Sequence, residues 1–130
     1  MIRRIEINDY SYNINGKIIK FPEKVYEAIL MDDKIIVDFN WARLKQSFPN
    51  SEYWRGVWCY DFKGNVLWQV EAPYSINPNT GKKNIHTDGE GAIDRVGYSE
   101  KENKIIVYGR VGYEVDPETG KLGDIIWYER

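Results

Sequence analysis

Residues 56–68 read GVWCYDFKGNVLW, and residues 111–127 read VGYEVDPETGKLGDIIW. Each stretch predicts a strand that ends in Asp, a turn that contains Gly, and a further strand that ends in Trp. The same four residues, KIIV, precede each stretch, at 34–37 and again at 104–107. The chain therefore carries the pattern of one antiparallel blade twice, which is too few for the four to eight blades of a closed propeller.

The segments around this repeat predict an all-β fold, an antiparallel meander of about ten strands with at most one short helix. We expect one domain over residues 1–130, with an N-terminal hairpin in residues 1–22 that ends at Pro22. Two blade-like, four-stranded units follow in residues 24–70 and 93–129. Between them, residues 73–92 are rich in Pro, Gly and Asn and predict a long loop. Face-to-face packing of the units and a continuous curled sheet both fit the pattern.

Composition narrows the class of protein. Hydrophobic residues make up 42% of the 130 residues and aromatic residues 15%, which excludes general disorder and suits strands. The net charge is −2, so no basic field for nucleic acid is expected. The N-terminus lacks the apolar segment of a signal peptide, and no apolar run approaches the length of a membrane helix. We therefore expect a cytoplasmic protein without membrane contact.

The segment between Val37 and Gly56 has no counterpart in the second copy of the repeat. Asn40 is a suitable N-cap for about one or two helical turns, and Pro49 would end them. Because loops carry binding residues on a rigid scaffold, aromatic and basic side chains here are candidates for a protein-binding site. These candidates are Trp41, Arg43, Tyr53 and Trp54. The structural alternative is that the rings cover one end of the sheet.

Carboxylates supply a second candidate surface. They follow the predicted loop and continue past the next strand: Asp88, Glu90, Asp94, Glu100 and Glu102. A group of negative charges would attract a basic protein partner and speed the encounter with it. The alternative is a solvated surface that only keeps the protein soluble.

Catalytic chemistry has little support in the residue types. His86 is the single histidine, and a hydrolytic site would need it beside a carboxylate and a hydroxyl such as Ser75 or Thr87. A calcium loop in residues 88–94 departs from the EF-hand spacing. One histidine and one cysteine, Cys59, are too few for a zinc site. We expect no catalytic residues, no metal and no cofactor.

Residues 57–68 and 113–122 resemble the repeat of the pyrroloquinoline-quinone-type β-propellers. In that repeat, a strand ending in Asp, a turn with Gly and a Trp in the next strand recur from blade to blade. The resemblance implies that Asp and Gly shape the turn and that Trp packs between neighbouring sheets. No residues match a quinone site, so the cofactor is not carried over.

The whole chain is also similar to small bacterial proteins that combine three features. These are Phe-Pro near the front, a Trp-containing hairpin in the middle and a Gly-Tyr-Glu-Val-Asp strand near the end, here Phe21-Pro22, residues 66–69 and residues 112–116. Such proteins look like the immunity proteins encoded beside secreted bacterial toxins. The resemblance implies tight binding to a toxin domain and assigns no binding residue.

Three hypotheses follow. The first is a non-enzymatic immunity protein that neutralises a toxin domain by forming a complex. The second is an enzyme acting on a small molecule or a glycan, with residues 73–92 as its lid. The third is a propeller-like module that assembles with copies of itself through unpaired edge strands.

Overall fold

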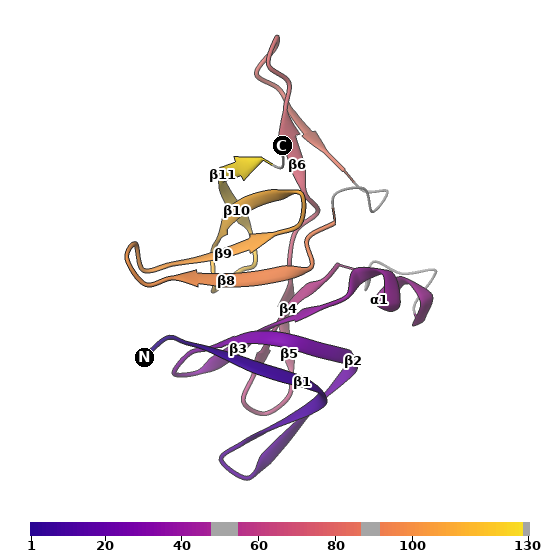
Figure 1. The fold of residues 1–130 in the computed structure, drawn as a ribbon, viewed down its shortest axis with the longest axis vertical. Coiled ribbons are helices and arrows are strands. Elements are labelled where there is room, and N and C mark those ends of the chain that lie inside the picture. The colour runs from indigo at the N-terminus through magenta and orange to yellow at the C-terminus, as the bar shows by residue number, and fades with distance from the viewer. Residues whose placement is uncertain (48–54, 87–91, 129–130) are drawn as a thin grey trace.

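The computed structural model describes residues 1–47, 55–86 and 92–128. Its strands are all antiparallel, as the sequence predicts (Figure 1). The N-terminal sheet contains β1 (Arg3–Ile14), β2 (Lys17–Leu30), β3 (Lys34–Phe39), β4 (Val57–Asp61) and β5 (Val66–Gln69). The C-terminal sheet contains β8 (Arg95–Ser99), β9 (Lys104–Tyr108), β10 (Val111–Val115) and β11 (Leu122–Tyr128). A separate hairpin pairs β6 (Tyr74–Ile76) with β7 (Lys83–Ile85), and one short helix, α1 (Trp41–Ser47), follows β3.

Strands that are consecutive in the chain are neighbours in each sheet, so both sheets are meanders. The two KIIV segments begin β3 and β9, and each is followed by the hairpin that the repeat predicts, β4–β5 and β10–β11. The all-β meander with one short helix is therefore confirmed. None of the described helices is long and apolar enough to span a membrane.

The N-terminal hairpin is longer than the sequence suggests. β2 continues through Pro22 to Leu30, whereas a strand end was predicted at Pro22. The proline is tolerated because the β1–β2 register jumps there, from Ser11 opposite Lys20 to Asp9 opposite Val25. A residue without a backbone N–H fits a place where the ladder is interrupted.

The end of this hairpin forms a second hydrophobic core on one face of the N-terminal sheet. Ile14, Ile19 and Phe21 pack there against side chains of β3 and β4. The ring of Phe21 lies 5.3 Å from that of Tyr60 and 6.2 Å from that of Phe39, both edge-on. Leu44 of α1 joins the same core. As a result, all six residues of β3 are buried.

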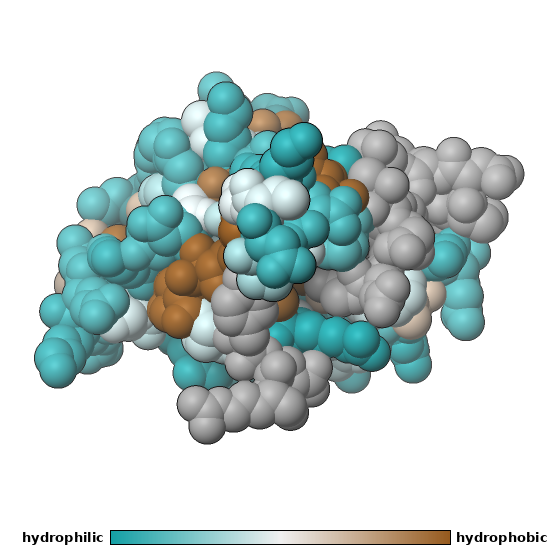
Figure 2. All heavy atoms as spheres, turned by 90° about the horizontal axis from the view of Figure 1, so that it is seen from above, coloured by the Kyte–Doolittle hydropathy of each residue, from teal (hydrophilic) through white to brown (hydrophobic). Residues whose placement is uncertain are grey.

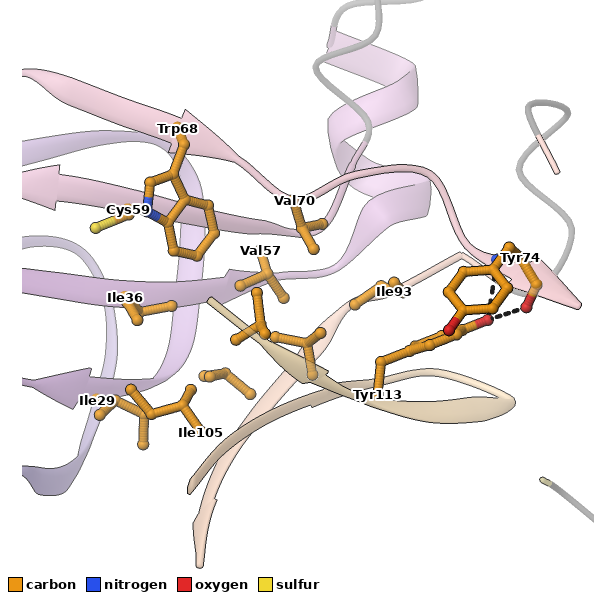
Figure 3. Packing of buried hydrophobic residues seen from close by; sticks show 13 residues of the cluster. Ile29, Ile36, Val57, Cys59, Trp68, Val70, Tyr74, Ile93, Ile105 and Tyr113 are labelled. Carbon is orange, nitrogen blue, oxygen red and sulfur yellow. Dashed lines mark hydrogen bonds between the residues drawn. The ribbon is translucent and has the colours of Figure 1, made fainter. Parts of the chain in front are cut away.

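The other face of the N-terminal sheet packs on the C-terminal sheet (Figure 3). Ile29, Ile36 and Cys59 contribute from the first sheet, and Ile105 and Tyr113 from the second. The two units therefore pack face to face, which decides between the alternatives that the sequence left open.

A buried carboxylate joins the two sheets. Asp38 is fully buried, and its two oxygens accept hydrogen bonds from the backbone N–H of Glu27, at 2.8 Å, and of Val96, at 3.3 Å. The first donor lies at a break in the β2–β3 register, between Val25 and Ala28. Burial raises the pKa of Asp38 to about 6, although these two hydrogen bonds favour the ionised form.

Residues 73–92 contain more order than a long loop. Within the described part of this segment, β6 and β7 form a hairpin that extends from the rest of the molecule, at the top of Figure 1. Tyr113 holds its base: the hydroxyl accepts the N–H of Tyr74, at 3.0 Å, and donates to the Tyr74 carbonyl, at 2.5 Å (Figure 3). The short strands escaped the sequence analysis because each has only three residues.

Candidate functional site

The two blade-like units are stacked head to tail. By the repeat, Ile36 corresponds to Ile106, and Ile35 and Val37 correspond to Ile105 and Val107. Ile36 faces the interface between the sheets, where it meets Ile105 and Val107 of the second unit. The front of one unit therefore packs on the back of the next, as successive propeller blades do.

The side chain of Trp68 connects the two stacked units. Trp68 lies in β5 and is 7% exposed, and its indole Nε1 donates to the carbonyl of Pro117 at 2.9 Å. A Cβ added to Gly120 would collide with the Trp68 ring, so the ring occupies the space directly above that glycine. Gly120 has a φ of 75°, in the left-handed region. Trp68 of the first unit thus packs on the turn between β10 and β11 of the second unit.

The second unit repeats the front face, and no third sheet of the described residues packs against it. Core residues alternate along β8, β9 and β10, so the residues between them face away from the N-terminal sheet. We call this surface the outer face of the C-terminal sheet. It consists of Arg95, Gly97, Lys104, Ile106, Tyr108, Gly112, Glu114 and Trp127.

Trp127 is the counterpart of Trp68 on this face and is 38% exposed. It is paired in register with Gly112, and a Cβ added to Gly112 would lie 2.5 Å from its indole ring. The rings of Trp127 and Tyr108 lie 5.6 Å apart, and Tyr108 in turn lies over Gly97. Two glycines thus provide the room for an aromatic pair that lies close to the sheet.

Charged side chains border the aromatic pair. Lys104 forms an ion pair with Glu114 on the adjacent strand. The guanidinium of Arg95, on β8, lies 5.9 Å from the ring centre of Tyr26, on β2. An apolar centre with a polar rim is the composition of a protein-binding surface. In the view of Figure 2, from the β6–β7 end, a hydrophobic area coloured brown lies between hydrophilic side chains.

The opposite end of the stack is closed. In the second unit, Ile105 and Val107 belong to the core that also contains Trp68. In the first unit, their counterparts Ile35 and Val37 lie on the face that points away from the C-terminal sheet. The end of the β1–β2 hairpin covers it instead, and Trp58 and Tyr60 there are each 3% exposed. The molecule therefore has one capped end and one open end.

Of the aromatic and basic candidates, the structure describes Trp41 and Arg43, both on α1. Trp41 is half-buried at the start of α1, and Lys45 Nζ lies 5.8 Å from its ring centre. Arg43 is exposed and lies 3.7 Å from a carboxylate oxygen of Glu23. Tyr53 and Trp54 lie outside the described residues. Two helical turns after Asn40 were predicted correctly: Asn40 Oδ1 accepts the Arg43 N–H at 3.2 Å.

The three acidic candidates that the structure describes, Asp94, Glu100 and Glu102, do not form one group. Glu100 and Glu102 are exposed in the β8–β9 turn, whereas α1 lies on the opposite side of the molecule in Figure 1. Asp94 precedes β8 and is therefore a full strand length away from that turn. Burial raises its pKa. The segment 100–104 contains as many lysines as glutamates, and Asp88 and Glu90 lie outside the described residues.

A small pocket at the base of the β6–β7 hairpin combines polar and apolar groups. Ser75 Oγ lies 3.0 Å from His86 Nε2, because both residues lie on the same face of the hairpin. The pocket has a volume of about 150 Å³, and its lining includes Arg110 beside Pro73 and Tyr113. The structure thus pairs the histidine with one of the two hydroxyls named from the sequence.

Metal and thiol chemistry find no support in the described residues. Within ranges 1–47, 55–86 and 92–128, no three His, Cys, Asp or Glu side chains are grouped as a metal site would need. Cys59 is fully buried in the core, and burial raises the pKa of its thiol to about 12. A buried thiol in this state acts as a packing residue.

Sequence reasoning missed the outer face of the C-terminal sheet, although a signal was present. Gly97 and Gly112 interrupt two predicted strands, and a glycine inside a strand often marks the close approach of another group. Trp127 is the register partner of Gly112, and the ring of Tyr108 lies diagonally across from Gly97, 3.7 Å from where its Cβ would be.

Comparisons with known proteins identify no relative: no family model, no curated protein and no solved structure matches this chain.

Proposed function

We propose that this protein is a non-enzymatic protein-binding module whose partner packs on the outer face of the C-terminal sheet. One observation carries the proposal: the face that holds Trp127 is open, whereas its counterpart around Trp68 is covered by the next unit. The exposed tryptophan sits among half-buried aromatic and aliphatic residues, which is the environment of a binding hot spot.

The partner that we propose is a toxin domain, and the role is that of an immunity protein in the cytoplasm. The resemblance of Phe21-Pro22, residues 66–69 and residues 112–116 to small bacterial immunity-like proteins supports this role. A stacked β scaffold with one open end suits it, because a preformed surface loses little conformational entropy on binding.

In this proposal, the aromatic pair contributes more to binding than the acidic side chains do. The described acidic candidates are spread over two ends of β8, and Lys101 and Lys104 accompany Glu100 and Glu102. Affinity then depends on the aromatic pair, and binding depends only weakly on salt.

The test is a pull-down with the product of the adjacent gene, or from the native bacterium, with partners identified by mass spectrometry. We expect one stoichiometric partner with a toxic domain for the wild-type protein and for Leu67→Ser. Trp127→Ser removes the anchor and is expected to lose that partner. Leu67 is a suitable control because it is exposed, on β5, and lies outside the outer face. Equal recovery by Trp127→Ser would refute the proposed surface.

A hydrolase is the second candidate, and the Ser75–His86 pair favours it. In such an enzyme, His86 Nε2 takes the Ser75 hydroxyl proton while Oγ attacks the carbonyl carbon of an ester. The leaving alkoxide then takes the proton from His86, and water later releases the acyl group. Labelling by a fluorophosphonate probe at Ser75, lost in His86→Gln, would support this candidate. If Ser75 is not labelled, the hydrolase candidate is excluded and only the protein-binding proposal remains.

A further inference from the structure

The contact that joins the two sheets has two sides, a tryptophan and a turn with a left-handed glycine. The chain contains a second tryptophan and a second turn of these kinds, which do not contact each other. The matched contact places Trp68 on the turn that begins at Asp116 and reads DPETGK. Trp127 is a second tryptophan of this kind; it is 38% exposed, and none of the described turns packs on it as the turn of Gly120 packs on Trp68. Residues 77–82 read NPNTGK and form a second turn of this kind, at the tip of the β6–β7 hairpin.

The two turns have the same hydrogen bonds. In residues 116–121, the Gly120 N–H donates to the Asp116 carbonyl at 2.8 Å, and the Asp116 N–H to the Lys121 carbonyl at 2.9 Å. In residues 77–82, the Gly81 N–H donates to the Asn77 carbonyl at 2.8 Å, and the Asn77 N–H to the Lys82 carbonyl at 2.9 Å. The first side chain of each turn caps it in the same way: Asp116 Oδ1 accepts the Glu118 N–H at 2.9 Å, and Asn77 Oδ1 accepts the Asn79 N–H at 2.8 Å.

The glycines of the two turns have similar backbone conformations but differ in whether a tryptophan ring packs on them. Gly81 has a φ of 71°, close to the 75° of Gly120, so both glycines present the same backbone surface. A Cβ on Gly120 would collide with the Trp68 ring, whereas a Cβ on Gly81 would meet nothing within 4 Å.

The hairpin also offers the apolar side chain that accompanies this turn. Val115 precedes the first turn and is buried in the core between the sheets. Ile76 occupies the equivalent position before the second turn and is 41% exposed. It lines an open hollow along the hairpin together with residues of the turn. In the first turn, Trp68 packs on the glycine and belongs to the same core as the aliphatic residue before the turn; in the second turn, both the glycine and the aliphatic residue are open.

The turn between β4 and β5 is a poorer match to the turn of residues 116–121. It runs from Asp61 to Gly64 and is one residue shorter, so Asp61 Oδ1 accepts the N–H groups of Lys63 and Asn65 instead. It also belongs to the capped end of the stack, where Phe62 packs against the core under the N-terminal hairpin. The turn of residues 77–82 is therefore the one that fits Trp127.

We propose that two copies of this chain associate by packing Trp127 of one copy on the turn of residues 77–82 of the other. Within one copy the two halves do not meet, because the hairpin tip points away from the C-terminal sheet (Figure 1). Each copy carries both halves, so the contact forms twice in a closed pair or once per copy in an open chain.

The test is sedimentation velocity over a range of protein concentrations. We expect reversible self-association of the wild-type protein. Trp127→Ser should weaken it by at least about tenfold, as the loss of a tryptophan anchor does. Leu67→Ser is the control for removal of an exposed apolar side chain and should self-associate like the wild type.

Gly81→Ala tests the other half of the contact, because its methyl group would occupy the place of the indole. Gly16→Ala is the matched control: Gly16 is also at a hairpin turn, with a φ of 86° and open space around its Cβ position. Both substitutions introduce the same backbone strain, but only Gly81→Ala should weaken association. A concentration-independent wild-type monomer, or equal association of all variants, would overturn the inference.

This contact uses the same outer face as the proposed partner, so a second copy and the partner would compete. The sedimentation test needs no partner, and the pull-down is done with each variant separately. The two proposals can therefore fail independently: a monomer that binds its partner through Trp127 refutes only self-association.

Discussion

The indole of Trp68 occupies the space above Gly120, and this contact locks a strand end of one sheet onto a turn of the other. The glycine is required twice, for its positive φ and for the absence of a Cβ. The same relationship explains why the open end of the stack carries an exposed tryptophan.

Gly120→Ala should destabilise the fold markedly. A left-handed conformation costs alanine about 1–2 kcal/mol, and displacement of the packed ring adds about 1–3 kcal/mol. Gly81→Ala has nearly the same φ and open space, so only the first contribution applies. Denaturant unfolding of both variants measures the difference, and equal losses of stability would show that the ring is not tightly packed on Gly120.

Gly112→Ala should displace Trp127 from the sheet with little loss of global stability. The methyl group would collide with the indole, but the exposed ring can rotate away. We expect the ring-current shifts that Trp127 induces at its neighbours to disappear from the NMR spectrum. Gly123→Ala is the control, because its Cβ would lie 3.4 Å from the Glu114 Cβ, an ordinary contact. Unchanged shifts in Gly112→Ala would contradict the described position of the ring.

Asp38 should make stability depend on pH between about 4 and 6. Burial raises its pKa to about 6 in the folded state from the ordinary value of 3.8, so the native state holds the proton over this interval. Stability from this group is therefore lost as the pH rises, by up to about 3 kcal/mol. The groups around it include Arg95, which favours the charged form, and Glu27, which opposes it.

The free energy of unfolding of Asp38→Asn and the wild type, measured from pH 4 to 7, tests this dependence. The difference between the two should change across the interval, because the asparagine does not titrate. Asp61→Asn is the control with the opposite sign: hydrogen bonds from Asn65 lower the pKa of Asp61, so its contribution is lost as the pH falls. A constant difference for Asp38→Asn would mean that its pKa is not shifted.

Tyr113→Phe should loosen the β6–β7 hairpin. The hydroxyl bonds both the N–H and the carbonyl of Tyr74, and its loss leaves two buried backbone groups unpaired, at a cost of about 1–3 kcal/mol each. Amide hydrogen exchange over residues 74–86 should accelerate more than exchange in β3. Tyr98→Phe is the control, since that hydroxyl donates to the exposed Asn103. Slow exchange in Tyr113→Phe would show that the hairpin is held by other contacts.

The repeat predicted the fold well because strand alternation and turn residues are local signals. Lys34 and Lys104 begin equivalent strands, and both Asp–Gly hairpins form where the sequence places them. The extension of β2 beyond Pro22 was not predictable, because the register jump that accommodates the proline depends on β1. The hairpin of residues 74–85 was missed because its strands are short, although the NPNTGK and DPETGK turns are visibly alike.

The candidate site was the weaker part of the sequence analysis. Aromatic content drew attention to Trp41, whereas Trp127, at the end of the repeat, was interpreted only as part of the blade pattern. Which face of a strand stays open depends on how the units stack and on which end a hairpin caps. Both are long-range relationships, and only the structure supplies them.

The most direct test of the central claim is the affinity of the wild-type protein, Trp127→Ser and Leu67→Ser for the product of the adjacent gene, which we propose to be a toxin domain, measured by titration calorimetry. If the outer face of the C-terminal sheet is the binding surface, Trp127→Ser weakens binding by at least about tenfold while Leu67→Ser binds like the wild type. Equal affinities of all three proteins, or no binding by any of them, would contradict the account.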